Sequence, residues 1–153
     1  MDVSKTDFFE EPLVRDALPE DAPAIARLNR DEMGYEYPEE KTMEKLRALL
    51  SSGRDKILVA ECSGTVVGYV HLCNYELIYY DSLKNVMGIA VSREYRRRGI
   101  GKMLLSAAED WARADGAAGV RLSSGEIRTG AHAFYRSLGY SGTKKQLNLK
   151  KIF

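Results

Sequence analysis

The segment that decides the fold runs from Met87 to Lys102 and reads MGIAVSREYRRRGIGK. Its first part, Met87 to Val91, is apolar or small throughout and predicts a buried strand. Two glycines, Gly99 and Gly101, then stand where an amphipathic helical pattern begins, so the strand passes through a glycine-containing turn into a helix. An anion suits such a helix start, because unpaired backbone N–H groups and the helix dipole point at the same place.

Positive charge gathers at the same turn. Five cationic side chains lie within ten residues, namely those of Arg93, Arg96, Arg97, Arg98 and Lys102. Because glycine lacks a Cβ atom, the backbone at Gly99 and Gly101 can approach phosphate oxygens closely. The segment therefore predicts a pyrophosphate site. Its predicted contacts come from Arg96, Arg97, Arg98, Gly99, Ile100, Gly101 and Lys102.

Two common phosphate loops do not fit this segment. A Walker loop requires a glycine where the chain has Arg96, and a serine or threonine where it has Met103. A dinucleotide fingerprint requires a third glycine at the position of Leu104. The glycine spacing therefore excludes both types of nucleotide loop.

The composition is that of one globular domain and argues against several classes of function. The 153 residues are 44% apolar and 29% charged, and the net charge of +1 provides no overall field that favours nucleic acid or an anionic membrane. Charges or glycines interrupt every apolar stretch, so no membrane-spanning helix is expected. The acidic N-terminal residues lack the features of a signal peptide, which predicts a cytoplasmic location.

Cysteine and histidine are scarce. Cys62 and Cys73 are the only cysteines and do not form a C-x-x-C pair, and the two histidines are far apart. No metal site is therefore expected. Two reduced, half-buried thiols are the expectation, and a catalytic cysteine is the alternative.

Hydrophobic periodicity around the deciding segment predicts one α/β domain without repeats or linkers. Strands are expected at residues 13–17, 56–61, 66–73, 84–91, 120–122 and 146–152, and helices at about 19–33, 39–52, 100–115 and 131–138. The order is β-α-α-β-β-β-α-β-α-β. Residues 1–11 are expected to form a flexible tail, which leaves 12–153 as the single domain.

The glycine pattern that fits is Arg/Gln-x-x-Gly-x-Gly/Ala, which Arg96, Gly99 and Gly101 satisfy. It resembles the acetyl-CoA pyrophosphate loop of the GCN5-related N-acetyltransferase (GNAT) family, and the resemblance extends from about Val14 to Phe153. It implies an acyl-CoA N-acyltransferase fold, in which a mixed, mostly antiparallel central sheet carries helices on both faces. It also implies acetyl-CoA as the co-substrate. A solvated basic turn is the alternative.

The C-terminal half is similar to one branch of that family, which includes aminoglycoside 6′-N-acetyltransferases and aminoalkylphosphonate N-acetyltransferases. The similarity is carried by Leu122-Ser123-Ser124, Arg128, Ala131-His132, Phe134-Tyr135 and Leu138-Gly139-Tyr140. One position departs from the pattern, because Gly125 stands where many relatives carry asparagine. Through this similarity Arg128 and Phe134 are expected to contact the coenzyme.

The resemblance also implies where acetyl transfer takes place. The strand from Met87 to Val91 would separate from its parallel neighbour at residues 120–122. The pantetheine arm would lie in the gap, against Ile89, Ala90 and Val91. A backbone N–H near Ile89 would then donate to the developing oxyanion.

Tyr135 matches the family tyrosine that protonates the departing sulfur of coenzyme A. A phenol has an ordinary pKa of about 10, so it stays protonated at neutral pH and can give its proton to a thiolate. A buried structural tyrosine is the alternative.

The general base is left open among three possibilities. Some relatives place a glutamate where this chain has Met87. His132 shares a helix face with Tyr135, and His71 lies on a predicted strand, so either imidazole could take the proton of the amine. A water chain to solvent is the third possibility.

Acidic side chains interleaved with tyrosines lie between the first two predicted helices. They are Asp31, Glu32, Glu36, Glu39 and Glu40 with Tyr35 and Tyr37, and Tyr80 is expected on a facing wall. Carboxylates and aromatic faces suit a cationic amine. Asp31, Glu32, Tyr35 and Tyr80 are therefore the predicted acceptor-binding residues, and an ordinary solvated acidic turn is the alternative.

The sequence thus predicts transfer of an acetyl group from acetyl-CoA to a primary amine of a small molecule or of a protein, by direct attack of the amine on the thioester. A catalytically silent CoA-binding regulatory or partner-binding module of the same fold is the alternative. A nucleic-acid binder that uses Arg93 and residues 96–98 is disfavoured by the near-neutral charge. Relatives often pair, so a homodimer is the expected assembly if the chain associates. The identity of the acceptor stays open.

Overall fold

The computed structural model describes residues 10–153, so most of the predicted N-terminal tail lies outside the described residues. The strands are β1 (Leu13–Asp16), β2 (Asp55–Cys62), β3 (Thr65–Leu77), β4 (Tyr80–Val91) and β5 (Gly119–Arg121). The helices are α1 (Ala22–Met33), α2 (Glu39–Leu50), α3 (Ile100–Ala114) and α4 (Thr129–Ser137). Short 3-10 turns, Pro19–Asp21 and Arg93–Tyr95, precede α1 and α3.

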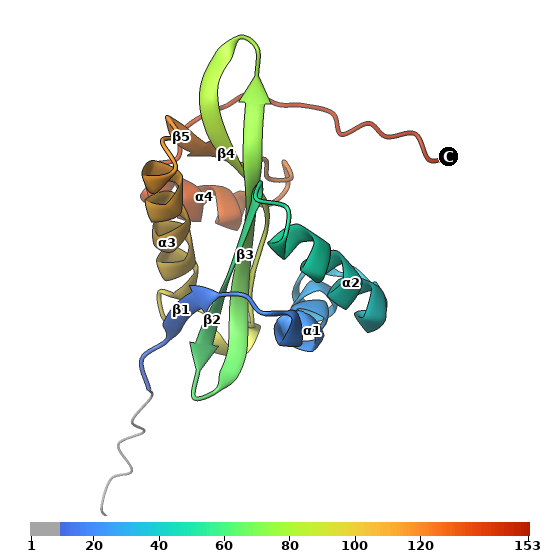
Figure 1. Ribbon diagram of the computed structural model, residues 1–153. Coiled ribbons are helices and arrows are strands. Elements are labelled where there is room, and N and C mark those ends of the chain that lie inside the picture. The colour runs from blue at the N-terminus through green and yellow to red at the C-terminus, as the bar shows by residue number, and fades with distance from the viewer. Residues whose placement is uncertain (1–9) are drawn as a thin grey trace, which may run out of the picture.

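The five strands form one sheet in the order β1-β2-β3-β4-β5. Neighbouring strands are antiparallel from β1 to β4, whereas β4 and β5 are parallel. Helices α1 and α2 lie on one face of the sheet, and α3 and α4 lie on the other (Figure 1). The prediction of a mixed, mostly antiparallel sheet with helices on both faces is confirmed.

Strand β2 shows how the two faces of the sheet are filled. Ile57 and Val59 belong to the core beneath α1 and α2, whereas Leu58 and Ala60 belong to the core beneath α3. Because side chains alternate between the faces of a strand, a strand covered on both faces needs a continuous apolar run. At Gly68 in β3 a Cβ atom would lie 3.2 Å from the Leu104 side chain of α3, so glycine permits this close approach.

The parallel pairing of β4 with β5 is short. It joins Leu83 to Gly119, Lys84 to Val120 and Asn85 to Arg121, and then it stops. Strand β4 continues to Val91 with β3 on one side and, among residues 10–153, no strand on the other. The unpaired outer edge of residues 86–91 is called the β4 notch below.

The β3–β4 hairpin is longer than the sequence predicted. The strands reach Leu77 and begin again at Tyr80, so the polar pair Asp81-Ser82, interpreted as part of a loop, lies inside β4. The hydroxyl of Ser82 donates a hydrogen bond of 2.9 Å to the carboxylate of Glu76 across the hairpin. The apolar sequence pattern ends before the strand pairing of β3 with β4 ends. Much of this part of the hairpin is exposed, so its side chains have little apolar core to pack against.

The predicted final strand at residues 146–152 is wrong for this structure. These residues are exposed and pair with no strand of the described chain, so α4 is the last regular element. An alternating pattern favours an extended backbone but does not provide the neighbouring edge that a strand needs. Within residues 10–153, no helix has the length and apolar character needed to cross a membrane.

Candidate active site

The turn before α3 presents backbone N–H groups to solvent. Gly99 caps the helix with a φ of +76°, in the left-handed region that favours glycine, and no side chain caps the helix start. The N–H of Met103 bonds to the carbonyl of Gly99 at 2.9 Å, so the N–H groups of residues 100–102 precede the first hydrogen bond of the helix. Ile100, which is 1% exposed, anchors this turn in the core. The turn can therefore receive an anion.

Gly101 serves a second purpose that the sequence did not indicate. A Cβ atom built at Gly101 would lie 3.1 Å from Cζ of Phe134. The Phe134 ring of α4 therefore rests directly on the first turn of α3, which only a glycine allows at this distance. The structure thus brings two groups of predicted coenzyme residues, the glycine turn and Phe134, into contact.

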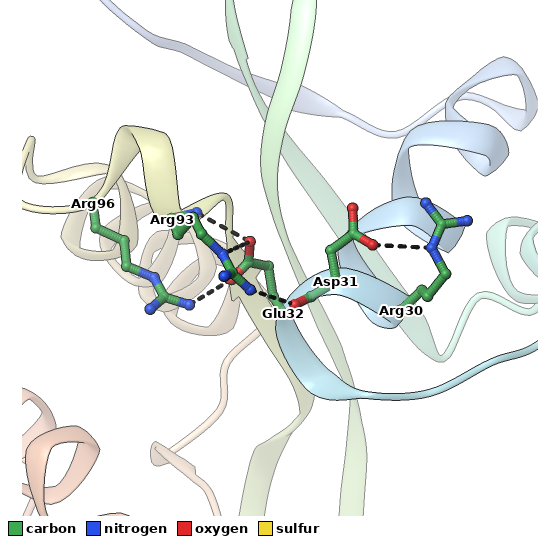
Figure 2. A network of polar contacts seen from close by, with 5 residues as sticks. All are labelled: Arg30, Asp31, Glu32, Arg93 and Arg96. Carbon is green, nitrogen blue, oxygen red and sulfur yellow. Dashed lines mark hydrogen bonds and ion pairs between the residues drawn. The ribbon is translucent and has the colours of Figure 1, made fainter.

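Glu32 holds two of the arginines that lead into this turn, as Figure 2 shows. Its carboxylate accepts a hydrogen bond of 2.6 Å from the Arg96 guanidinium and one of 3.1 Å from the backbone N–H of Arg93. The Arg93 side chain also donates to the backbone carbonyl of Asp31, at 3.0 Å. The Asp31 carboxylate accepts from Arg30 instead, at 2.9 Å. Both predicted acceptor carboxylates are thus engaged by arginines.

The position of Glu32 follows from the way α1 ends. Gly34 adopts a φ of +74° and its N–H bonds to the carbonyl of Arg30, a left-handed helix end that glycine permits. The last turn of α1 therefore stops beside the segment after β4, with the Glu32 side chain only 6% exposed. Because the Glu32 carboxylate neutralises the Arg96 guanidinium, the positive charge at the turn comes mainly from Arg97, Arg98 and Lys102. Arg97 and Lys102 are exposed, and Arg98 stacks on the Tyr95 ring at 5.1 Å.

The predicted acceptor residues do not form one group. Glu32 lies beside residues that follow the end of β4, whereas Tyr80 stands at the beginning of that strand. A strand of this length spans roughly 35 Å at about 3.3 Å per residue. Tyr35, which is 66% exposed, follows α1, so the structure places Tyr80 far from Asp31, Glu32 and Tyr35.

A β-bulge interrupts β4 at Met87. Val86 pairs with Leu72 and Gly88 pairs with His71, so Met87 is an extra residue that pairs with no residue of β3. Bulges bend a strand and redirect its backbone groups, and they are common beside active sites. The amino-acid sequence carries no local signal for this bulge, because the extra residue exists only relative to the β3 register.

The β4 notch is closed at one end by a polar cluster. Lys84, 4% exposed, donates hydrogen bonds to Asn74 at 2.6 Å and to Asp115, and it lies over the Trp111 ring. Asn85 accepts a hydrogen bond from the guanidinium of Arg121 on β5. These contacts hold β4 and β5 together where their pairing ends, and they leave the following residues of β4 apart from β5.

The side chains of the three predicted coenzyme residues in the β4 notch point to opposite faces of the sheet. Ile89 and Val91 pack against the core beneath α3, and Ala90, which is 6% exposed, packs beneath α1 and α2. The hydroxyl of Ser124, in the loop after β5, is buried and has no hydrogen-bond partner among the described residues. A buried hydroxyl without a partner is costly, so it is a candidate for a ligand contact.

Tyr135 is 8% exposed and lies on α4 next to the Phe134 ring, with 5.4 Å between ring centroids. Its ring also meets Tyr140 edge-on at 6.0 Å. Burial raises the pKa of Tyr135, and nearby Arg128 offsets part of this rise. The phenol is therefore protonated throughout the neutral range and can act as an acid.

The two histidines have different surroundings. His132 places Nε2 2.9 Å from the backbone carbonyl oxygen of Gly125, and because a carbonyl only accepts, Nε2 carries the hydrogen. His71 places Nε2 2.7 Å from Oδ1 of Asp55. Burial raises the pKa of Asp55, but hydrogen bonds from Ser52 and His71 outweigh it, so the net pKa is lowered and the carboxylate is charged at neutral pH.

His71 lines a cavity of about 180 Å³ beneath α1 and α2, called the α1–α2 cavity below. The polar residues of its lining are Asn29, Tyr37, Thr42, Lys45, Tyr69 and His71. Tyr69 donates a hydrogen bond to Asn29, and burial raises the pKa of Tyr69 to about 12. A Cβ atom at Gly88 would lie 3.4 Å from the Tyr69 hydroxyl, so one residue that lines this cavity reaches Gly88 of β4.

The model of the acetyltransferase (GNAT) family matches residues 22–140. A sequence search of curated proteins finds no match. Residues 10–153 hold no group of three or more histidine, cysteine, aspartate or glutamate side chains placed to bind a metal ion.

Three solved structures illustrate the structural similarity. A transcriptional regulator from Bacillus halodurans C-125 has a TM-score of 0.85 at 18% identity, covering 92% of this chain and 100% of that one. The aminoglycoside N-acetyltransferase AAC(6′)-Iy in complex with CoA has a TM-score of 0.83 at 16% identity, covering 95% and 98%. An aminoglycoside acetyltransferase from an uncultured soil metagenomic sample, in complex with trehalose, has a TM-score of 0.79 at 22% identity, covering 97% and 99%. With a family match over most of its length, the chain belongs to the acetyltransferase (GNAT) family.

Proposed function

We propose that this protein transfers the acetyl group of acetyl-CoA to a primary amine by direct attack of the amine on the thioester. The observation that carries the proposal is the Phe134 ring of α4, which rests on Gly101 in the first turn of α3. This contact joins the helix that carries the buried phenol of Tyr135 to the uncapped start of α3 at Gly99, which the chain reaches from the unpaired edge of β4 through residues 92–98. Acetyl transfer needs an anion site, a thioester channel and a proton donor, and these features correspond to them.

The residues present suit acetyl-CoA as a co-substrate. The N–H groups of residues 100–102 and the side chains of Arg97, Arg98 and Lys102 would bind its diphosphate. The edge of β4 at Ile89 to Val91 would hydrogen-bond the pantetheine arm, as an added strand does. The Ser124 hydroxyl, which has no hydrogen-bond partner within residues 10–153, would supply a further polar contact in place of the asparagine that is absent at Gly125.

The reaction forms a C–N bond and breaks the C–S bond of the thioester. The lone pair of a neutral amine attacks the carbonyl carbon, and the carbonyl oxygen becomes an oxyanion. A backbone N–H of β4 near Ile89, beside the Met87 bulge, would stabilise that charge. As the intermediate collapses, Tyr135 would protonate the departing thiolate sulfur. The raised pKa of Tyr135 keeps the proton available for this step.

We assign the general base to His71. Asp55 orients the ring by accepting the Nε2 hydrogen, which leaves Nδ1 as the basic nitrogen, the arrangement that orients catalytic histidines elsewhere. His71 also lines the α1–α2 cavity against β4, where an amine would approach the thioester. His132 is the weaker candidate because its hydrogen bond to Gly125 fixes the loop after β5.

The acceptor is proposed to enter the α1–α2 cavity with its amine group. A cavity of about 180 Å³ accommodates an aminomethyl group and its neighbours but not a large ligand, so the rest of a larger acceptor would lie outside. Tyr37 and Tyr69 offer aromatic faces and hydroxyls for a cationic amine. We favour a small-molecule amine, and a lysine or N-terminal amine of a protein is the alternative.

A CoA-binding regulatory module is the second candidate. It is favoured by the similarity to a structure described as a transcriptional regulator, which shows that this fold occurs under more than one functional description. Its expected property is coenzyme binding without turnover.

A thiol-release assay separates the candidates. Purified protein is mixed with acetyl-CoA and a panel of small amines, amino sugars and lysine peptides, while free thiol is followed. Release above the amine-free rate supports the enzyme. Calorimetric binding of acetyl-CoA without release for any amine supports the module, and the absence of binding removes both.

A further inference from the structure

The α1–α2 cavity has an unbalanced charge. Ten of the described residues line it, and Lys45 of α2 is the only lysine or arginine among them. Within residues 10–153, no aspartate or glutamate contributes to this lining. An acceptor with several ammonium groups would meet no carboxylate inside the cavity, whereas an anionic group would meet a cation. The lining therefore distinguishes acceptors by the charge that they carry beside their amine.

Lys45 reaches the cavity because of its place on α2. One face of this helix lines the cavity, at the three- and four-residue spacing of helical neighbours: Thr42, Lys45, Leu46 and Leu49. Leu46 is buried and Lys45 is exposed, so Lys45 stands at the border between the buried face and solvent. A lysine in such a position lays its methylene stem along apolar surface and keeps its ammonium in water. The Lys45 ammonium therefore belongs at the mouth of the cavity.

No carboxylate of the described chain neutralises this ammonium. Lys45 forms no ion pair with any side chain of residues 10–153. Asp55, which lies behind the cavity residue His71, has both oxygens engaged: Oδ1 lies 2.7 Å from Nε2 of His71, and Oδ2 accepts a 2.7 Å hydrogen bond from the Ser52 hydroxyl. Glu32, which was expected to bind the acceptor, is held by arginines before α3. The Lys45 ammonium is thus available to an anion from outside the chain.

Asn29 of α1 adds a neutral donor to the same lining. Its side-chain oxygen accepts the hydrogen bond of the Tyr69 hydroxyl, which leaves its amide nitrogen as a donor without a partner among the described residues. A carboxylate accepts hydrogen bonds at two oxygens, so it can use an ammonium and an amide N–H together. The cavity therefore offers both kinds of donor that a carboxylate binds.

We propose that the acceptor carries a carboxylate a few bonds from its primary amine, and that Lys45 binds this carboxylate at the mouth of the α1–α2 cavity. This inference rests on the proposed acetyl transfer and narrows its acceptor to a small amino acid. The volume of about 180 Å³ limits the separation of the two groups, because it holds only a short chain between them. One ammonium matches one carboxylate in charge, so a monoanion fits better than a polycation.

Matched acceptors test the proposal in the thiol-release assay. β-Alanine and γ-aminobutyrate are compared with their carboxamides, which keep the amine and the chain length but lack the negative charge. The quantity measured is the ratio of kcat/KM for the acid to kcat/KM for the amide. Comparing this ratio between protein variants cancels the intrinsic difference in basicity between the two amines.

Lys45→Gln is expected to lower the ratio about three- to fivefold, which is the scale of an ion pair that stays partly in water. Lys45→Glu should lower it roughly tenfold or more, because attraction becomes repulsion. Lys41→Gln is the matched control, since Lys41 is an exposed lysine one turn earlier on α2 that does not line the cavity, and it should leave the ratio unchanged. Equal ratios in the wild type and both Lys45 variants overturn the proposal.

A binding measurement separates the carboxylate site from acetyl transfer itself. Isotope-labelled protein without coenzyme is titrated with β-alanine while the NMR signals of its backbone amides are followed. If no amine is acetylated, the proposed function fails, and these signals decide alone. Saturable shifts at residues 42–49 that β-alaninamide does not cause, and that Lys45→Glu loses, support the carboxylate site, whereas their absence overturns it. If amines are acetylated with no dependence on Lys45, the carboxylate site is removed and acetyl transfer stands.

Discussion

The two sides of strand β4 are built in different ways. On the outer side, one continuous segment, residues 86–101, provides the notch and the turn before α3, and most of its binding groups belong to the backbone. On the inner side, the α1–α2 cavity draws its polar groups from separate elements, with Asn29 on α1, Thr42 on α2, and Tyr69 and His71 on β3.

This difference predicts how each side responds to mutation. Backbone N–H groups keep their direction only while the turn keeps its conformation, so one substitution that changes φ can remove several contacts together. In the cavity the polar groups come from separate elements, so the loss of one side chain leaves the others in place. The predictions below run from the largest expected effect to the smallest.

Gly99→Val is expected to weaken coenzyme A binding roughly 50- to 100-fold, since a β-branched residue at this left-handed φ costs about 1–3 kcal/mol and misdirects the amides. Titration calorimetry with coenzyme A measures the change. Gly116→Val is the matched control, because Gly116 has the same φ of +76°, has open space around its Cβ position and lies beyond the other end of α3. Equal affinity in both variants would remove the turn from the coenzyme site.

Tyr135→Phe is expected to lower kcat tenfold or more while leaving the KM for acetyl-CoA nearly unchanged, because a general acid typically contributes about 10²- to 10⁴-fold to the rate. Because the pKa of Tyr135 is raised, the wild-type kcat should show no loss from this group until the pH exceeds about 10. Tyr140→Phe is the control: it removes the hydrogen bond to Glu109 and should reduce stability rather than kcat. Unchanged turnover in Tyr135→Phe contradicts the assignment.

His71→Asn is expected to lower kcat about five- to tenfold near neutral pH, since the proposed general base is gone. His132→Asn serves as the comparison and should change kcat by less than about twofold. Steady-state rates from pH 5.5 to 9 provide the measurement. If His132→Asn has the larger effect, the proton leaves on the α4 side instead of through the cavity.

Glu32→Gln is expected to weaken coenzyme A binding by up to about fivefold, because the arginines it holds are themselves largely exposed and screened. The loss reflects a loosened turn, so it should shrink as salt is raised. Glu36→Gln removes a neighbouring carboxylate that makes no contact with the turn and should leave the affinity unchanged. Tighter binding in Glu32→Gln would show that neutralising Arg96 matters more than holding it.

Asp55→Asn is expected to reduce the loss of folding stability in acid. The pKa of Asp55 is lowered in the folded protein, so its contribution to stability is present above about pH 4 and is lost as the pH falls through the folded-state pKa. Urea unfolding at pH 7 and pH 3 measures the change. The wild type should lose more stability than Asp55→Asn between these two values, and an equal loss would contradict a charged Asp55 paired with His71.

Residues whose signals are local could be predicted. Gly99 was assigned to a turn at a helix start, and its left-handed φ agrees, because glycine is favoured there whatever the rest of the chain does. The burial of Tyr135 could likewise be expected from its place on a short amphipathic helix. Its role, and that of the coenzyme residues, stays a prediction.

Residues whose surroundings come from elsewhere in the chain were harder to interpret. Glu32 was grouped with the tyrosines that follow it, yet its partners Arg93 and Arg96 lie more than sixty residues away. The bulge at Met87 exists only in relation to β3. Neither could be inferred locally, because a side chain takes the best partner that packing brings within reach.

The amino-acid sequence by itself determined where the helices and most of the strands form, and that a basic glycine turn opens a helix, since period and backbone preference act over a few residues. Tertiary structure alone decided which elements touch: that β4 leaves β5 after Asn85, that Glu32 binds the turn, and that His71 meets Asp55. Residues 146–152 show the boundary most clearly. Their alternation favours an extended backbone, but a strand also needs a neighbouring edge, and the described residues place none beside them.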